Sequence, residues 1–123
     1  MIGFMIVDDS LVVRKNIQKL VEKSSNKVVC QAKDGLDALK LYRENRNEID
    51  VVTLDISMQG LNGLETLQKL LEINKSLIVF MITSHGEESM VMDTIDNGAT
   101  GYILKPVTDE KIEQIVQKVK NEF

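Results

Sequence analysis

Short apolar runs alternate with longer amphipathic segments along the whole chain, and this alternation restricts the fold more than any other feature. The apolar runs predict five strands, at residues 4–7, 28–32, 51–54, 77–82 and 102–104. The segment after each run carries apolar residues at helical spacing, which predicts five helices. Strands that alternate strictly with helices are typical of a parallel sheet with helices on both faces.

We therefore predict an α/β fold, a flavodoxin-like (βα)5 doubly wound sandwich. Its five parallel strands are expected in the order 2-1-3-4-5. The run at 77–82 is the most apolar and indicates an interior strand that is buried on both faces, whereas the more polar run at 28–32 suits an edge. A length of 123 residues suffices for one domain, so residues 1–123 are expected to form a single unit.

The composition argues against several classes of protein. The net charge is −4, with 19 acidic against 15 basic residues, whereas nucleic-acid binding needs a basic face. A single cysteine, Cys30, excludes an intramolecular disulfide and suits a reducing compartment. The apolar segment at residues 1–7 is not preceded by basic residues and is followed directly by Asp8. It therefore predicts neither a signal peptide nor a membrane span. We expect a cytoplasmic protein that contacts neither nucleic acid nor membrane directly.

Polar residues follow four of the five predicted strands at the point where each strand ends. They are three acids, a hydroxyl and an ammonium: Asp8, Asp9, Asp55, Thr83 and Lys105. Because the carboxyl ends of parallel strands meet at one edge of the sheet, where such folds bind ligands, we expect these side chains to lie together. Neighbouring carboxylates repel one another, so a cluster of three either raises pKa values or holds a cation. Mg²⁺ suits such oxygen ligands and leaves positions for phosphate oxygens.

This set of groups predicts phosphoryl chemistry at Asp55. A carboxylate can act as the nucleophile that forms an acyl phosphate, while Lys105 and Thr83 bind the phosphoryl oxygens. Each residue alone has a simpler explanation, since acids after a strand usually face solvent or cap a helix, and a lone lysine usually lies at the surface. The prediction therefore depends on all five residues sharing one edge.

Four motifs in the chain resemble the receiver domain of bacterial and archaeal two-component response regulators. They are Asp8-Asp9-Ser10 with Arg14, Val51-Val52-Thr53-Leu54-Asp55, Gly63-Leu64-Glu65, and Gly98-Ala99-x-Gly101-Tyr102-x-x-Lys105-Pro106. The last motif is the most specific, and the resemblance to this CheY-like family extends from end to end. It identifies residues 1–123 as one receiver domain.

The resemblance implies a Mg²⁺ site beside a phosphoacceptor. Asp55 corresponds to the acceptor, and it would bind Mg²⁺ directly together with Asp9. Asp8 would act through a water molecule, and Ser57 would add its backbone carbonyl. Lys105 would bind a phosphoryl oxygen.

The resemblance also implies a switch formed by Thr83 and Tyr102. The Thr83 hydroxyl would move toward the phosphoryl group, and the Tyr102 ring would turn inward to fill the space left. The bond between Lys105 and Pro106 corresponds to one that is cis in the family, although X–Pro bonds in general are mostly trans.

The function implied is a signalling switch of a two-component system, with chemotaxis as one candidate pathway. A sensor histidine kinase would donate the phosphoryl group to Asp55, and the surface of the fourth helix, fifth strand and fifth helix would then control a downstream protein. The chain would catalyse only its own phosphoryl transfer and autodephosphorylation, so we do not expect an enzyme. Met90, Val91, Met92 and Ile95 are spread too widely for one buried stripe, so some of them are expected to be exposed on that surface.

Three other functions are compatible with the same fold class. The chain could be the receiver domain of a larger regulator with a DNA-binding or enzymatic output domain. A flavodoxin-type carrier needs a neutral phosphate-binding loop after the first strand, where this chain has Asp8-Asp9-Ser10. An aspartyl-phosphate hydrolase of the haloacid dehalogenase type uses an Asp-x-Asp pattern, which is absent at Asp55. The last two functions are therefore less favoured.

Two positions depart from the family pattern in the loop after Asp55. Gln59 stands where the family often has proline, and Asn62 stands where aspartate is common. Loss of the proline predicts a more mobile loop, and neither change removes a phosphoryl or metal ligand. His85, the only histidine, is interpreted as a solvated loop residue or, together with Ser57, as a group that controls water access to the acyl phosphate.

Overall fold

The computed structural model describes residues 1–122, and its strands form one parallel sheet in the order β2-β1-β3-β4-β5. The strands are β1 (Gly3–Val7), β2 (Lys27–Ala32), β3 (Val51–Asp55), β4 (Ile78–Thr83) and β5 (Gly101–Leu104). The helices are α1 (Leu11–Lys23), α2 (Gly35–Asn45), the 3-10 helix η1 (Arg46–Glu48), α3 (Gly63–Ile73), α4 (Glu88–Asp96) and α5 (Asp109–Glu122). The predicted fold class and strand order are confirmed.

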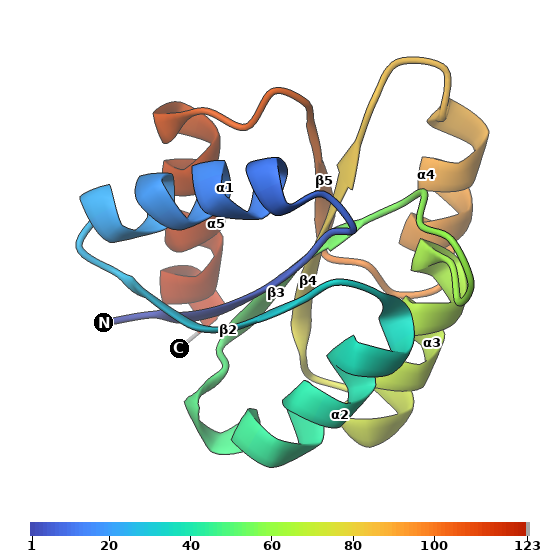
Figure 1. Cartoon of the computed structure of the whole chain (residues 1–123), viewed down its shortest axis with the longest axis horizontal. Coiled ribbons are helices and arrows are strands. Elements are labelled where there is room, and N and C mark those ends of the chain that lie inside the picture. Colours follow the sequence, from blue (N-terminus) through green and yellow to red (C-terminus); the bar gives the residue numbers. More distant parts are fainter. Residues whose placement is uncertain (123) are drawn as a thin grey trace.

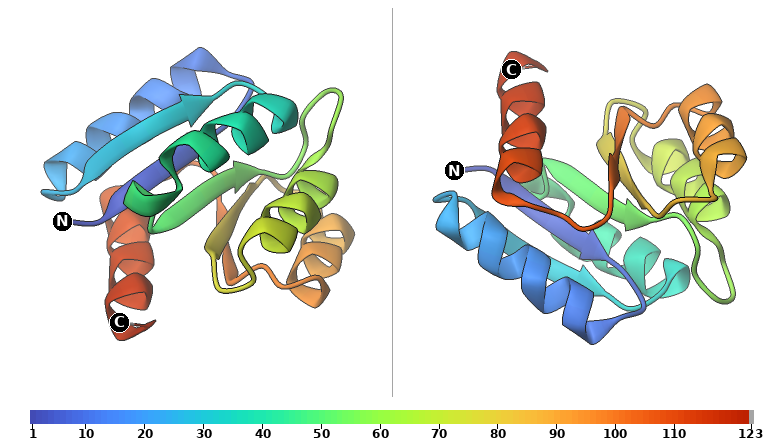
Figure 2. Two further views of the ribbon diagram at one scale, coloured as in Figure 1. Left: turned by 90° about the horizontal axis from the view of Figure 1, so that it is seen from below. Right: turned by 90° about the horizontal axis from the view of Figure 1, so that it is seen from above.

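Helices cover both faces of the sheet. α1 and α5 pack on one face, and α2, α3 and α4 pack on the other (Figures 1 and 2). β2 lies at an edge and is fully buried only at its last residue, whereas all six residues of β4 are buried, as predicted for an interior strand. Among the described residues, no helix is both long enough and apolar enough to cross a membrane.

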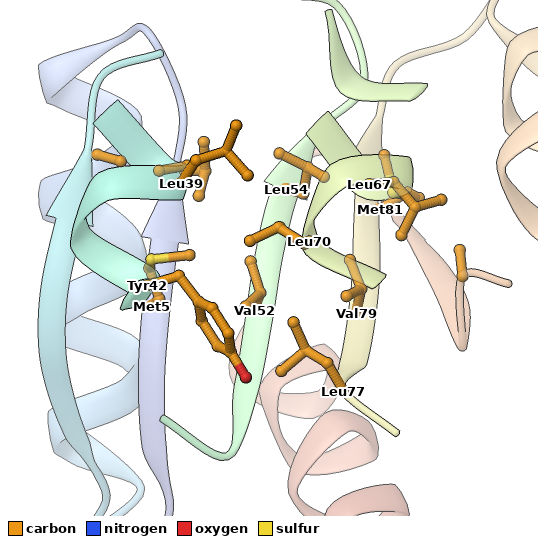
Figure 3. Close-up of a cluster of buried hydrophobic side chains, with 14 of the residues drawn as sticks. Met5, Leu39, Tyr42, Val52, Leu54, Leu67, Leu70, Leu77, Val79 and Met81 are labelled. Carbon is orange, nitrogen blue, oxygen red and sulfur yellow. The ribbon is translucent and has the colours of Figure 1, made fainter. Parts of the chain in front are cut away.

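An apolar cluster fills the space between the sheet and the layer of α2, α3 and α4. Figure 3 shows its central side chains: Met5, Leu39, Tyr42, Val52, Leu54, Leu67, Leu70, Leu77, Val79 and Met81. Because side chains alternate along a strand, the intervening residues Val51, Ile78 and Ile82 join a second cluster under α1 and α5. Thr83 follows the alternation of Val79 and Met81, so it belongs to the face that α4 covers.

Side-chain caps begin several of the helices that lead away from the carboxyl edge of the sheet, α1, α2 and α3 among them. Ser10 Oγ accepts a hydrogen bond from Val13 N at 3.3 Å, at the start of α1. Asn62 Oδ1 accepts from Glu65 N at 3.0 Å, and Glu65 Oε1 accepts from Asn62 N at 3.5 Å, which forms a capping box for α3. Asparagine and aspartate cap helices about equally well, so the departure at Asn62 preserves the start of α3.

α4 carries apolar side chains on more than one face. Val91 is buried, whereas Met90 and Met92 are 41% and 56% exposed, so the prediction that some of these residues face solvent is confirmed. The helix ends at Asp96, before Asn97 and Gly98, and Gly98 has a φ of 104°, a conformation that favours glycine.

Candidate functional site

The carboxyl ends of the strands bring four of the five predicted side chains close together. Carboxylate oxygens of Asp8, Asp9 and Asp55 all lie within 4.8 Å of one another. Lys105 Nζ lies 3.5 Å from Asp55 Oδ1 and 3.7 Å from Asp8 Oδ2. Asp8 and Asp55 are almost fully buried, with exposed fractions of 1% and 3%, whereas Asp9 faces solvent. The site is therefore an acidic pit with one ammonium group at its side.

Asp8 is held in place by the loop that follows it. Ser10 N donates to Asp8 Oδ1 at 2.8 Å, and Arg14 Nη1 donates to the Asp8 carbonyl oxygen at 2.6 Å. The other carboxylate oxygen, Oδ2, is buried and accepts no hydrogen bond from any residue between 1 and 122. A buried polar atom without a partner costs free energy, so this oxygen is suited to a cation or to water bound to a cation.

A glycine brings α3 against the backbone of Asp55. Ile56 N donates to Ile82 O at 3.0 Å, which continues the strand pairing beyond the end of β3. Gly63, the first residue of α3, packs directly on this segment, and a Cβ at Gly63 would lie 2.7 Å from Ile56 Cα and 2.8 Å from the Asp55 carbonyl oxygen. Both distances are too short for a side chain. The glycine of the Gly63-Leu64-Glu65 motif is therefore needed to seat α3 beside the candidate acceptor.

Burial and like charge raise the pKa values of the two buried acids. The pKa of Asp55 rises from 3.8 to about 6, chiefly because the carboxylate is desolvated and secondly because Asp8 is near. Lys105 and the backbone N–H of Ser57 oppose this rise. Burial also raises the pKa of Asp8, against the Ser10 N–H and Lys105. In the folded protein the ionised carboxylates therefore repel one another and are poorly solvated. A bound cation would reduce this electrostatic cost.

The predicted switch residues flank a pocket. Thr83 lies one residue beyond Ile82, which pairs with Asp55, and its side chain is only 2% exposed. Tyr102 is 55% exposed. A pocket of about 350 Å³ lies between them, and its lining includes Thr83, His85, Val91, Met92, Tyr102 and Leu104. The structure thus leaves open space on the inner side of the Tyr102 ring.

Glu87 takes part in the site although no role there was predicted for it from the sequence. Its Oε1 atom accepts from Thr83 Oγ1 at 3.0 Å and from Ser84 N at 2.6 Å. These hydrogen bonds, against the opposing effect of burial, hold the pKa of Glu87 below its usual value. The only sign of this contact in the sequence is an acid four residues after the predicted switch threonine.

Lys111 is a second contributor that the sequence interpretation missed. Its Nζ atom donates to the carbonyl oxygens of Leu104 at 2.6 Å and Pro106 at 3.0 Å, on either side of Lys105. The Lys105-Pro106 peptide bond between them is cis, as the resemblance implied. Lys111, in the first turn of α5, therefore fixes the backbone from which Lys105 reaches the carboxylates.

The residues beside the pit differ in exposure. His85 is exposed, in agreement with its interpretation as a solvated loop residue. Ser57 and Gln59 are exposed as well, whereas Met58 between them is 8% exposed and joins the apolar cluster under α2 and α3. The loop after Asp55 is therefore anchored to the core at Met58, and its two flanking side chains are open to solvent.

Comparisons with known proteins agree with this site. The family model described as "Response regulator receiver domain" matches residues 4–117. The chemotaxis protein CheY of Listeria monocytogenes is 36% identical over 118 residues, which are 96% of this chain and 98% of the relative. A receiver domain protein from Clostridium thermocellum superposes with a TM-score of 0.93 at 29% identity, covering 99% of this chain and 96% of that chain. A chain of the CheX–CheY–BeF3–Mg²⁺ complex from Borrelia burgdorferi superposes with a TM-score of 0.89 at 33% identity, covering 97% and 89%.

A doubly wound parallel sheet with an acidic pit and a lysine at its carboxyl edge defines the class of two-component receivers. The chain belongs to the response regulator receiver domain family and is CheY-like. The family inferred from the sequence motifs is thereby confirmed.

Replacement of Asp55 by asparagine is expected to stabilise the metal-free protein above pH 6. Between the ordinary pKa of 3.8 and the folded-state value of about 6, the folded protein binds more protons than the unfolded chain, so its stability falls as the pH rises. Asparagine does not ionise, so the stability of the variant should not fall with rising pH for this reason. We expect the free energy of unfolding of Asp55→Asn to exceed that of the wild type by about 1 to 2 kcal/mol at pH 7.5 and by much less at pH 4.

Urea unfolding in a chelating buffer at the two pH values measures this difference. Asp96→Asn, at an exposed position of α4, is the matched control and should show no such gain. An Asp55→Asn variant that is no more stable than the wild type at pH 7.5 would contradict the repulsion described for the acidic pit.

Proposed function

We propose that this chain is a phosphorylation-dependent switch in which Asp55 accepts a phosphoryl group from a sensor histidine kinase. The observation that carries the proposal is the position of Lys105 Nζ, 3.5 Å from Asp55 Oδ1 within a cluster of three carboxylates. This geometry supplies an oxygen nucleophile together with a fixed positive charge for the oxygens of the incoming group. The CheY of L. monocytogenes, a chemotaxis protein, makes chemotaxis one candidate pathway.

In the proposed step, an Asp55 carboxylate oxygen forms a bond to phosphorus while the bond from phosphorus to the ring nitrogen of the donor histidine breaks. The departing nitrogen keeps the bonding electron pair. Lys105 binds one phosphoryl oxygen, and the Thr83 hydroxyl donates to another after it leaves its present partner. The chain supplies position and charge, which are the main requirements of phosphoryl transfer.

The donor set fits a Mg²⁺ ion. Asp9 and Asp55 would hold the ion through their carboxylates, and Ser57 would add its backbone carbonyl. The Oδ2 atom of Asp8, which accepts no hydrogen bond from residues 1–122, would act through a water molecule. When bound, Mg²⁺ supplies positive charge that offsets the carboxylates and the phosphoryl oxygens. The CheX–CheY complex from B. burgdorferi, which contains BeF3 and Mg²⁺, supports this assignment by analogy.

We further propose that the protein acts on no separate substrate and catalyses only its own phosphoryl transfer and autodephosphorylation. Its output would be a downstream protein bound at the surface of α4, β5 and α5. Met92 and Tyr102 are both more than half exposed there, at 56% and 55%, beside the pocket that Thr83 lines. The net charge of −4 speaks against direct nucleic-acid contact, and the free thiol of Cys30 suits a reducing compartment such as the cytoplasm.

Incubation with acetyl phosphate and Mg²⁺ is expected to add one phosphoryl group to the protein, as read by intact mass. The addition should disappear with a chelator and in Asp55→Asn, because the first removes the cation and the second removes the nucleophile. Asp96→Asn, on the exposed side of α4, should be labelled like the wild type. Labelling that survives in Asp55→Asn would show that another residue is the acceptor, and no labelling of the wild type would refute the proposal.

Binding of BeF3⁻ with Mg²⁺, as a mimic of the phosphoryl group, is expected to change the environment of Tyr102 and leave that of Tyr42 unchanged. These are the only two tyrosines. Tyr102 lines the pocket beside Thr83, whereas Tyr42 is fully buried under α2 and its hydroxyl accepts from Asn74 Nδ2 at 3.0 Å. NMR spectra of protein with labelled tyrosine give both signals in one sample. Equal spectra with and without BeF3⁻ would exclude a switch through Tyr102.

A further inference from the structure

The side chain of Glu87 engages the one hydroxyl that the proposed switch requires. Glu87 lies in the loop between β4 and α4, directly before the first residue of α4. Its Oε1 atom accepts from Thr83 Oγ1 at 3.0 Å and from Ser84 N at 2.6 Å. The Ser84 carbonyl oxygen, at 3.3 Å, is the other acceptor near Thr83 Oγ1, and it is both uncharged and more distant. Glu87 is therefore the principal partner of the Thr83 hydroxyl in this conformation.

A hydroxyl group carries one proton and can donate it to one strong acceptor at a time. While the Thr83 hydroxyl donates its hydrogen bond to Glu87, it cannot donate one to a phosphoryl oxygen on Asp55. The bond to Glu87 involves a carboxylate, and such charge-assisted hydrogen bonds are roughly twice as strong as neutral ones. Phosphorylation must therefore replace one charged acceptor of this hydroxyl with another.

We propose that Glu87 is an internal competitor for the Thr83 hydroxyl and, through it, a positioning residue that sets how readily a phosphoryl group at Asp55 moves Thr83. The proposal rests on the function proposed above, since it assumes that Asp55 takes a phosphoryl group. The conformation with the hydroxyl on Glu87 is the resting one, and the conformation with the hydroxyl on the phosphoryl oxygen is the active one. Glu87 shifts the equilibrium toward the resting conformation.

The position of Glu87 connects this competition to the proposed output surface. α4 begins at the next residue and has no side-chain cap at its N-terminus, and the Glu87 side chain that precedes it is bonded to Thr83 and Ser84. Release of Glu87 therefore frees the start of the helix that carries the exposed Met90 and Met92. The loss of one hydrogen bond at the site thus changes the constraint on the output surface.

The first test is the affinity for BeF3⁻ in the presence of Mg²⁺, measured by titration with NMR detection. A protein whose binding-competent conformation is only partly populated binds more weakly by that fraction. Glu87→Gln keeps the shape of the side chain and removes its charge, so we expect BeF3⁻ to bind roughly three- to tenfold more tightly. Glu87→Ala, which removes the acceptor altogether, should show a gain at least as large.

Glu88→Gln is the matched control for charge. It removes the same charge one residue away. Glu88 lines the pocket beside Thr83, but its Oε1 atom accepts from Gly86 N at 3.3 Å, and among the described residues it makes no hydrogen bond to Thr83. Its affinity for BeF3⁻ should equal that of the wild type. A gain in Glu88→Gln as large as that in Glu87→Gln would show that negative charge near the site, and no hydrogen bond to Thr83, weakens binding.

A double-mutant cycle with Thr83→Val decides whether Glu87 acts through the hydroxyl. Valine has nearly the shape of threonine and lacks the donor, so Glu87→Gln should change the affinity by less than about twofold in this background. The same gain with and without the Thr83 hydroxyl would overturn the proposal. Wild-type protein that binds BeF3⁻ no more weakly than Glu87→Gln would overturn it as well, whereas wild-type protein that does not bind BeF3⁻ at all would refute the proposed function itself.

Discussion

The mutual repulsion of three carboxylates at one edge of the sheet governs the chemistry of this site. Asp8 and Asp55 are buried beside each other, and Lys105 is the only ammonium within 4 Å of them among the described residues. Burial and like charge raise the pKa of Asp55 to about 6. A folded state that carries this cost gains more than an ordinary surface site from a bound cation, and the same electrostatics prepare an oxygen nucleophile beside a fixed positive charge.

The fold sustains this cost because its two apolar clusters do not depend on the acidic edge. Alternate residues of the central strands point into one cluster under α2, α3 and α4 and another under α1 and α5. The strands end together at one edge, where Asp55 is the last residue of β3 and Asp8 directly follows β1. Hydrogen bonds from Ser10 and Arg14 also hold Asp8. Gly63 adds to this precision, since its missing side chain lets α3 lie against the backbone of Asp55. On the side of β1 and β3 the acids are packed against buried backbone, whereas Thr83 and the half-exposed Tyr102 border an open pocket.

Much of this arrangement was predictable from the sequence because it depends on periodicity. The strand order and the grouping of Asp8, Asp55 and Lys105 follow from residues that stand at strand ends. Contacts that depend on loop conformation were not predictable in this way. Glu87 reaches Thr83 only because the loop before α4 folds back, and Lys111 meets two backbone carbonyls whose positions depend on the turn after β5. No regular spacing of residues in the sequence predicts either contact.

Of the three neighbouring acids, Asp55 is the residue that we propose takes the phosphoryl group. Borohydride reduction of protein treated with acetyl phosphate and Mg²⁺ converts an aspartyl phosphate to homoserine, and peptide mass spectrometry then locates the modified residue. We expect homoserine at position 55 alone, with Asp8 and Asp9 unchanged. Homoserine at position 8 or 9, or no homoserine in protein that gained a phosphoryl group, would contradict this proposal.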